Sequence, residues 1–347
     1  MKAARILITG GAGFLGGHMA RDFLAAGTPV RLFDREPRPE WACGEGIEYT
    51  EGDILDSAAL RLAMTGVGGV VHAAFASPRQ PVAAIRRVNA EGCRILGDAM
   101  LAGGVDRLVL VSSTIVEQQP RAHPFLRDAP LSRLDAYRAA RLEAEDIIRS
   151  YGDRGLSVAI VRPKTFIGSD RVGAFSLAFA AIRDGRSVPV LGNGRNRCQL
   201  LDIRDMAAGI RLLAESRAEG LFYFGASEFG SVEEDLHSLI AHAGTKSRLR
   251  FVSGSVARAI LRGVELGGMV PLSEWHHCCA KGKDSIVDCT RALTELGWRP
   301  LRSNVTALVE AYDWYCRTLE TGHDAPSTHL VPISHRLMRA LYEAVLR

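Results

Sequence analysis

The chain has 347 residues, of which 47% are hydrophobic, 24% charged and 7% aromatic. This composition excludes a disordered chain, and the length provides for one large domain or two smaller ones with a substantial core. The net charge of +4 is small and dispersed, so a nucleic-acid partner is not expected. Seven cysteines without a CxxC pair predict neither a disulfide framework nor a metal site. The absence of a signal peptide and of an apolar run of ~18 residues favours a cytoplasmic protein.

Short β-rich runs alternate with segments of helical spacing along the first half of the chain. Strands are expected at residues 5–9, 30–34, 47–50, 69–73, 107–112 and 157–161, with a late return strand at 220–224. Helices are expected at 14–26, 57–65, 84–102 and 134–151. This alternation predicts an α/β fold, a Rossmann-type doubly wound parallel sheet with a smaller, mostly helical C-terminal substrate lobe.

The same pattern divides the chain into three parts. Residues 1–166, rejoined by about 198–226, are expected to form the dinucleotide-binding domain, and 167–197 with 227–316 the substrate lobe. Residues 317–347 are expected to be an extension with an amphipathic helix at 333–347. Two interpretations of that helix stay open: docking on this protein or a second subunit, or peripheral contact with a membrane surface.

A glycine-rich turn lies between the first strand and the first helix. Gly10, Gly13 and Gly16 have the GxxGxxG spacing, which lets the backbone approach a pyrophosphate while the helix start, Phe14 and Leu15, offers N–H groups. Asp34 ends the second strand, where a carboxylate accepts hydrogen bonds from ribose hydroxyls and repels a 2′-phosphate. NAD is therefore favoured over NADP, although Arg35 could bind a 2′-phosphate.

A second group of polar residues follows the fifth strand. Ser113 stands at its C-terminal end, where ligands bind in open α/β sheets, and Tyr137 and Arg141 lie one turn apart in the following helix. With the glycine turn and Asp34, these residues resemble the extended short-chain dehydrogenase/reductase family over roughly residues 4–316. That family includes sugar-nucleotide epimerases and dehydratases, and hydroxysteroid dehydrogenases. Further matches are Gly52-Asp53-Ile54, His72-Ala73-Ala74, Asn89, Arg162-Pro163 and Leu296-Gly297-Trp298-Arg299-Pro300.

The resemblance implies that Tyr137 is the acid/base on a substrate hydroxyl or carbonyl, with Ser113 on the same oxygen. Thr114 could share that oxygen, although side chains alternate along a strand. The resemblance also implies cofactor contacts from Asp53, Ile54, Ala73, Ala74, Asn89, Tyr137, Arg141 and Pro163. For Asp53 a plain turn, for Asn89 a helix surface and for His72 a satisfied core histidine are the structural alternatives.

Arg141 departs from the family, which usually carries lysine four residues after the tyrosine. A free phenol has a pKa of about 10, so a tyrosine base needs positive charge nearby, and arginine keeps that charge but cannot relay a proton. Three interpretations stay open. Arg141 supports Tyr137 electrostatically; the acid/base has moved to Lys164, Glu117 or His123; or the chain binds cofactor without catalysis.

The substrate lobe offers candidate basic residues. Lys164, Arg195 and Arg197 could bind a substrate phosphate, while Cys198 stands where the family often has an arginine. The first hypothesis is an NAD-dependent epimerase or related oxidoreductase acting on a small molecule, a sugar. The family resemblance implies that this sugar is linked to a nucleotide. The alternatives are a dehydrogenase or reductase for a steroid-like or long-chain lipid group, with a pocket under residues 256–280, and a non-catalytic NAD-binding subunit. Relatives pair through the helix that carries Tyr137, so the resemblance implies a homodimer.

Overall fold

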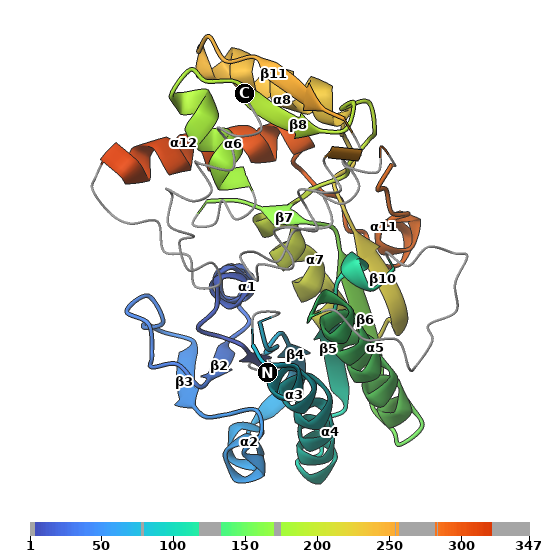
Figure 1. The fold of residues 1–347 in the computed structure, drawn as a ribbon. Coiled ribbons are helices and arrows are strands. Elements are labelled where there is room, and N and C mark those ends of the chain that lie inside the picture. The colour runs from blue at the N-terminus through green and yellow to red at the C-terminus, as the bar shows by residue number, and fades with distance from the viewer. Residues whose placement is uncertain are drawn as a thin grey trace. The chain divides into compact units, whose positions relative to one another are not determined.

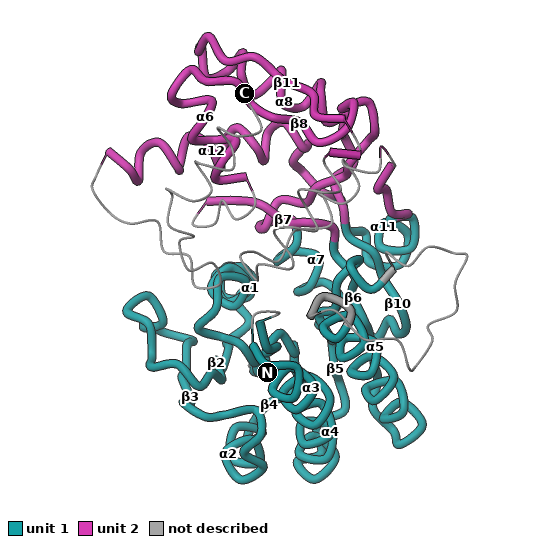
Figure 2. The backbone as a smooth tube through the Cα atoms, in the orientation of Figure 1, with its two compact units in different colours: residues 1–163, 206–224, 289–299 teal, residues 164–205, 225–288, 300–347 magenta. Residues whose placement is uncertain are grey.

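The chain divides into two compact units, each built from three separate stretches of sequence (Figure 2). The computed structural model describes residues 4–77, 80–117, 133–169, 175–253, 255–256, 282 and 284–320. Unit 1 comprises Met1–Pro163, Met206–Phe224 and Cys289–Arg299. Unit 2 comprises Lys164–Asp205, Gly225–Asp288 and Pro300–Arg347.

Unit 1 is built on a parallel sheet of seven strands in the order β10-β6-β5-β4-β1-β2-β3 (Figure 1). The strands are β1 (Arg5–Thr9), β2 (Val30–Asp34), β3 (Ile47–Glu51), β4 (Val67–His72), β5 (Arg107–Val111), β6 (Ser157–Pro163) and β10 (Gly220–Phe224). Every pairing between neighbours is parallel. The interior strand β5 is buried along its whole length, as expected of an apolar strand covered on both faces. The predicted fold class is confirmed.

Helices connect these strands and cover the sheet. They are α1 (Phe14–Ala25), α2 (Ser57–Ala63), α3 (Val82–Arg86), α4 (Gly92–Ala102), α5 (Arg133–Gly152), α7 (Ile203–Glu215) and α11 (Thr290–Leu296). The helices α2, α4 and α5 share one apolar core with the sheet, which includes Leu60, Leu96 and Ile148. The expected single helix at 84–102 is interrupted by a π-helical turn, η1 (Arg87–Glu91), between α3 and α4.

The described part of unit 2 has two small sheets and three helices of its own. Its strands pair as β7 (Phe166–Ile167) with β9 (Leu201–Asp202), and as β8 (Val188–Leu191) with β11 (Leu249–Val252). Its helices α6 (Ser176–Arg183), α8 (Val232–Ala243) and α12 (Asn304–Glu320) meet in an apolar core around Phe179, Leu239 and Tyr312. A capping box of Ser231 and Glu234 fixes the start of α8.

The boundaries of the units differ from those expected from the sequence. Residues 198–205 belong to unit 2, where Leu201 pairs with Phe166, and residues 289–299 belong to unit 1, where the Trp298 ring lies 4.5 Å from the Phe224 ring. The expected boundary at 316/317 falls inside α12, which continues to Glu320. The predicted helix at 333–347 lies outside the described residues. Within the described parts of the chain, no helix has both the length and the apolar character needed to cross a membrane.

Candidate active site

The glycine turn closes tightly between β1 and α1 in unit 1. Gly10 has φ +73°, and a Cβ there would lie 2.8 Å from the carbonyl oxygen of Ala73. At Gly16 a Cβ would lie 2.5 Å from the carbonyl oxygen of Gly11, so both positions exclude a side chain. Gly13 is the N-cap of α1 and makes no side-chain hydrogen bond to the helix start, which begins with Phe14 and Leu15. The turn is therefore shaped for an anionic group at a helix N-terminus.

Asp34 is directed back to this turn from the end of β2. Its Oδ2 accepts a hydrogen bond from the Ala12 amide at 3.0 Å, and its Oδ1 accepts one from the Glu36 amide at 3.1 Å. Arg35 is exposed and lies 3.4 Å from the Glu36 carboxylate. The tight turn, the uncapped helix start and the adjacent carboxylate fit the adenosine diphosphate part of NAD.

The end of β4 lies beside the glycine turn. The Thr9 hydroxyl lies 2.7 Å from His72 Nδ1, and the Ala73 amide donates to the Thr9 carbonyl at 3.1 Å. His72 is fully buried, and burial, with a smaller effect from the Arg141 charge, lowers its pKa to about 3. His72 is thus a neutral core histidine, and the backbone of Ala73 and Ala74 lies directly against Gly10.

Two further predicted cofactor residues differ in their surroundings. Asn89 lies in the π-helical turn and is fully buried, and its Oδ1 accepts from the Ala76 amide at 2.9 Å. A helix-surface role for Asn89 is therefore wrong. Asp53 is exposed and accepts from the Leu55 amide at 2.9 Å, as a turn residue does, while Ile54 is buried.

Tyr137 and Arg141 contact each other directly on α5. Arg141 Nε donates to the Tyr137 hydroxyl oxygen at 3.0 Å, and Arg141 Nη1 donates to the Val111 carbonyl at 3.1 Å. The guanidinium lies 3.7 Å from the centre of the Phe75 ring. The positive charge of Arg141 is thus held against the Tyr137 hydroxyl.

The three hydroxyl residues after β5 have different partners. The Ser113 side chain is half-buried, and its oxygen accepts from the Ile115 amide at 3.3 Å. The Thr114 hydroxyl is buried and donates to the Pro163 carbonyl at 3.1 Å. Thr114 is therefore engaged with the end of β6, which does not support the expectation that it shares a substrate oxygen with Ser113.

Glu145 is a residue that the sequence reasoning missed. Its side chain has no exposed surface and accepts from Ser112 Oγ at 2.5 Å and from Arg162 Nη2 and Arg149 Nη2 at 2.6 Å. Burial raises the pKa of Glu145, but the hydrogen bonds from Arg162 and Ser112 and the two positive charges outweigh it and hold the pKa below its usual value. Its spacing, four residues after Arg141, was the available signal, because such residues share one helix face.

The basic residues predicted to bind substrate lie in unit 2. Lys164 is buried, and its Nζ donates to the Ser285 hydroxyl. Arg195 and Arg197 are exposed, and the Arg197 guanidinium lies 4.8 Å from the Phe229 ring centre. Of the other candidates for a displaced acid/base, His123 lies outside the described residues, as do residues 257–280 of the expected lipid pocket.

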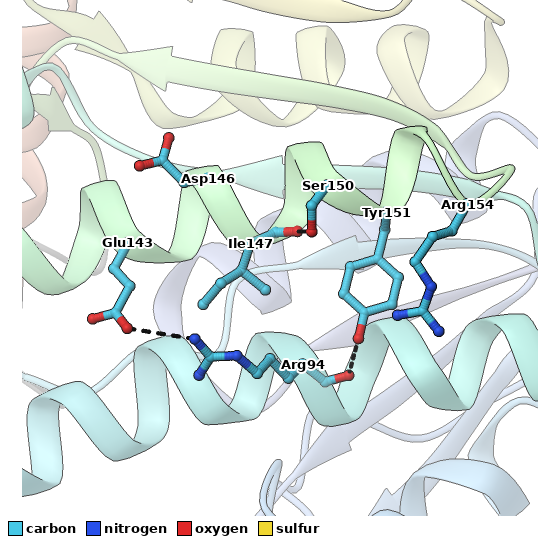
Figure 3. A pocket seen from close by; sticks show the side chains of 7 residues that line it. All are labelled: Arg94, Glu143, Asp146, Ile147, Ser150, Tyr151 and Arg154. Atoms are coloured by element: carbon cyan, nitrogen blue, oxygen red, sulfur yellow. Dashed lines mark hydrogen bonds and ion pairs between the residues drawn. The ribbon is translucent and has the colours of Figure 1, made fainter.

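A surface pocket of about 480 Å³ lies between α4 and the C-terminal half of α5 (Figure 3). Its lining comes from α4 and α5 and contains none of the predicted site residues. The lining residues are Arg94, Glu143, Asp146, Ile147, Ser150, Tyr151 and Arg154. Basic and acidic side chains alternate there, and the Arg94 guanidinium lies 3.5 Å from the Glu143 carboxylate.

These features define the class of the protein, a dinucleotide-dependent enzyme built on a Rossmann-type sheet. The chain belongs to the NAD dependent epimerase/dehydratase family, whose model matches residues 6–222. The expected membership of the extended short-chain dehydrogenase/reductase type is confirmed, and with it the expectation of an enzyme.

Three known proteins illustrate the similarity. The uncharacterized protein y4nG of Sinorhizobium fredii is 32% identical over 339 residues, which cover 96% of this chain and 85% of y4nG. The UDP-glucose 4-epimerase of Azospirillum brasilense is 31% identical over 195 residues, covering 54% of this chain and 53% of that enzyme. The crystal structure of the Bordetella bronchiseptica enzyme WbmG in complex with NAD has a TM-score of 0.69 at 21% identity, covering 91% of this chain and 94% of that one.

Proposed function

We propose that this chain is an NAD-dependent epimerase or related oxidoreductase that acts on a secondary hydroxyl or ketone of a nucleotide-linked sugar, with Tyr137 as acid/base. The observation that carries the proposal is the hydrogen bond from Arg141 Nε to the Tyr137 oxygen. It supports the first of the three interpretations of Arg141, in which arginine replaces the usual lysine as electrostatic support. Tyr137 thus has the permanent positive neighbour that a tyrosine base needs.

Each residue of the site has its own role in the proposed reaction. Tyr137 takes the proton from the substrate hydroxyl and returns it, Arg141 stabilises the phenolate, and Ser113 donates a hydrogen bond to the same substrate oxygen. The glycine turn, Asp34 and the Ala73–Ala74 backbone would hold NAD. Asn89 and Pro163 are further cofactor contacts that the family resemblance implies. The chemistry that NAD supplies when bound is the reversible removal of hydride from the hydroxyl-bearing carbon.

The choice of a nucleotide-linked sugar rests on the relatives and on the basic residues of unit 2. The Azospirillum relative is an epimerase of UDP-glucose. Arg195 and Arg197 are exposed guanidinium groups, which bind phosphates well, and Lys164 is the third basic residue proposed to contact the diphosphate. The preference for NAD over NADP rests on Asp34, whose carboxylate opposes a 2′-phosphate.

A homodimer in the cytoplasm belongs to the same proposal. The surface between α4 and α5 carries Arg94 and Arg154 together with Glu143 and Asp146, and a two-fold pair needs such self-complementary charge. Cys43, Cys93, Cys198, Cys289 and Cys316 are free thiols, as a reducing compartment requires. Light scattering on the purified protein tests the dimer, and a monomer at every concentration contradicts it.

The test of the proposed function is the Tyr137→Phe variant, assayed with a panel of nucleotide sugars. We expect kcat to fall by about 10²- to 10⁴-fold, because the general acid/base is lost. Bound NAD, measured by mass spectrometry of the purified protein, should remain. Tyr315→Phe, in the core of unit 2, is the matched control and should keep its activity. A chain that binds no NAD, or whose turnover survives Tyr137→Phe, contradicts the proposal, and turnover of steroid-like alcohols alone would move it to the lipid alternative.

A further inference from the structure

Phe75 provides a flat apolar surface beneath the Arg141 guanidinium. It follows β4 by three residues, and its ring centre lies 3.7 Å from Arg141 Cζ, a close stacking distance for a guanidinium over an aromatic face. The other neighbour of the ring is His72, whose ring centre is 4.9 Å away. Phe75 is half-buried and packs against the apolar core between the sheet, α4 and α5. Packing against this core therefore fixes the position of the Phe75 ring.

The stacking contact and two hydrogen bonds together determine where the guanidinium lies. Nη1 is bound to the Val111 carbonyl, and Nε is bound to the Tyr137 oxygen. The N–H groups that make both bonds lie in the guanidinium plane, whereas Phe75 covers one face of that plane. A lysine ammonium can also lie over an aromatic ring, but it has no plane that the ring could orient, so this kind of orientation is specific to arginine.

The titratable groups around Arg141 leave its charge available to Tyr137. His72 on β4 has a pKa lowered to about 3 by burial, and Cys93 on α4 has a pKa raised to about 12 by burial. Both groups are neutral near neutral pH. Glu145, one turn further along α5, is bound by Arg149 and Arg162, which offset its negative charge.

We propose that Phe75 is a positioning residue that holds the Arg141 guanidinium against the Tyr137 hydroxyl, and that this contact helps to set the pH range in which Tyr137 exchanges its proton. The inference deepens the proposed function, because it rests on Tyr137 as the acid/base. It also explains how this chain uses arginine where related sequences carry lysine. The Phe75 ring holds the arginine guanidinium in place, whereas a lysine ammonium would need other partners to hold it.

The test is a pH titration of the phenolate absorbance in the absence of substrate and NAD. For each variant, the signal of the same protein with Tyr137→Phe is subtracted, which isolates the Tyr137 transition. Phe75→Leu removes the ring but keeps an apolar side chain, and we expect the midpoint to move up by about half to one pH unit. Phe75→Tyr keeps the ring and should leave the midpoint in place. If Phe75→Leu does not fold, Phe75→Met removes the same contact with a longer side chain.

A double-mutant cycle with Arg141→Lys separates positioning from general packing. In the lysine background, Phe75→Leu should shift the midpoint by much less than in the wild-type background, because the stacking partner is already gone. An unchanged midpoint in Phe75→Leu, or the same shift in both backgrounds, overturns the inference. These readouts need no substrate, so a failure to find NAD binding or sugar turnover would overturn the proposed function alone.

Discussion

Individual side chains around Tyr137 show what a sequence pattern reveals and what it hides. Tyr137, Arg141 and Asp34 could be predicted, because each belongs to a motif with fixed spacing. Phe75 could not be predicted, and Glu145 had only its helix spacing as a signal, because the importance of both depends on partners that are distant in sequence. Phe75 meets Arg141 across 66 positions, and Glu145 meets Ser112 and Arg162 from two different strand ends.

Glu145 makes a prediction that concerns pH as well as stability. Glu145→Gln removes a buried negative charge but leaves Arg162 beside it, so we expect a loss of about 3 kcal/mol in unfolding free energy at neutral pH. The folded-state pKa of Glu145 is depressed, so its contribution is fully present above the ordinary glutamate pKa of 4.5 and is lost as the pH falls through the lower folded-state pKa. The deficit of the variant, measured by urea unfolding, should therefore shrink on acidification.

Asp146→Asn is the matched control for Glu145→Gln. Asp146 is the next residue on α5, its side chain is 76% exposed, and it pairs with Arg149 at 3.0 Å. Exposed pairs contribute little, so the control should lose no more than about 0.5 kcal/mol. Equal losses in the two variants, or a Glu145→Gln deficit that does not change with pH, would contradict the account of Glu145.

Whole helices and strands were easier to predict than their irregularities. The buried strands were located to within two residues, because short apolar runs between turns leave few alternatives, and the return strand at 220–224 was located correctly. The helix at 84–102 was predicted as continuous because its apolar spacing gives no sign of the π-helical turn at Arg87–Glu91. The π-helical turn contains one residue more than a turn of α-helix, and it places Asn89 inside the protein. A regular period of 3.6 residues does not predict that position.

The packing of α4 on α5 depends on Gly97. A Cβ there would lie 2.5 Å from the Tyr151 ring. The hydroxyl of that ring lies 2.8 Å from the Arg94 carbonyl oxygen and 2.8 Å from Asp98 Oδ1, and Figure 3 shows the first of these contacts. Gly97→Ala should therefore cost about 1–3 kcal/mol, measured by thermal or urea unfolding. Gly152→Ala, at the end of α5 with open space around it, should be neutral or slightly stabilising. A Gly97→Ala protein as stable as Gly152→Ala would show that the two helices can separate without cost.

At the scale of the whole molecule, the chain leaves unit 1 and returns to it twice. Residues 206–224 add the edge strand β10 and most of α7, and residues 289–299 add α11. The sequence indicated the first return through an apolar strand run. It did not indicate the second, because α11 is short and its contacts are with residues distant in sequence: Arg291 binds the Leu221 carbonyl, and Trp298, just after α11, reaches Phe224.

Trp298 therefore should contribute to the stability of unit 1 although it lies near the end of the chain. It is 2% exposed, its ring stacks on Phe224, and a Cβ on Gly209 would lie 2.8 Å from its Nε1. Trp298→Ala leaves a large cavity beside β10, and we expect a loss of about 3–5 kcal/mol in urea unfolding. Trp41→Ala, at a tryptophan that is 40% exposed in the same unit, is the control and should lose much less. Equal losses would mean that residues 289–299 are only loosely attached and that unit 1 is complete at Phe224.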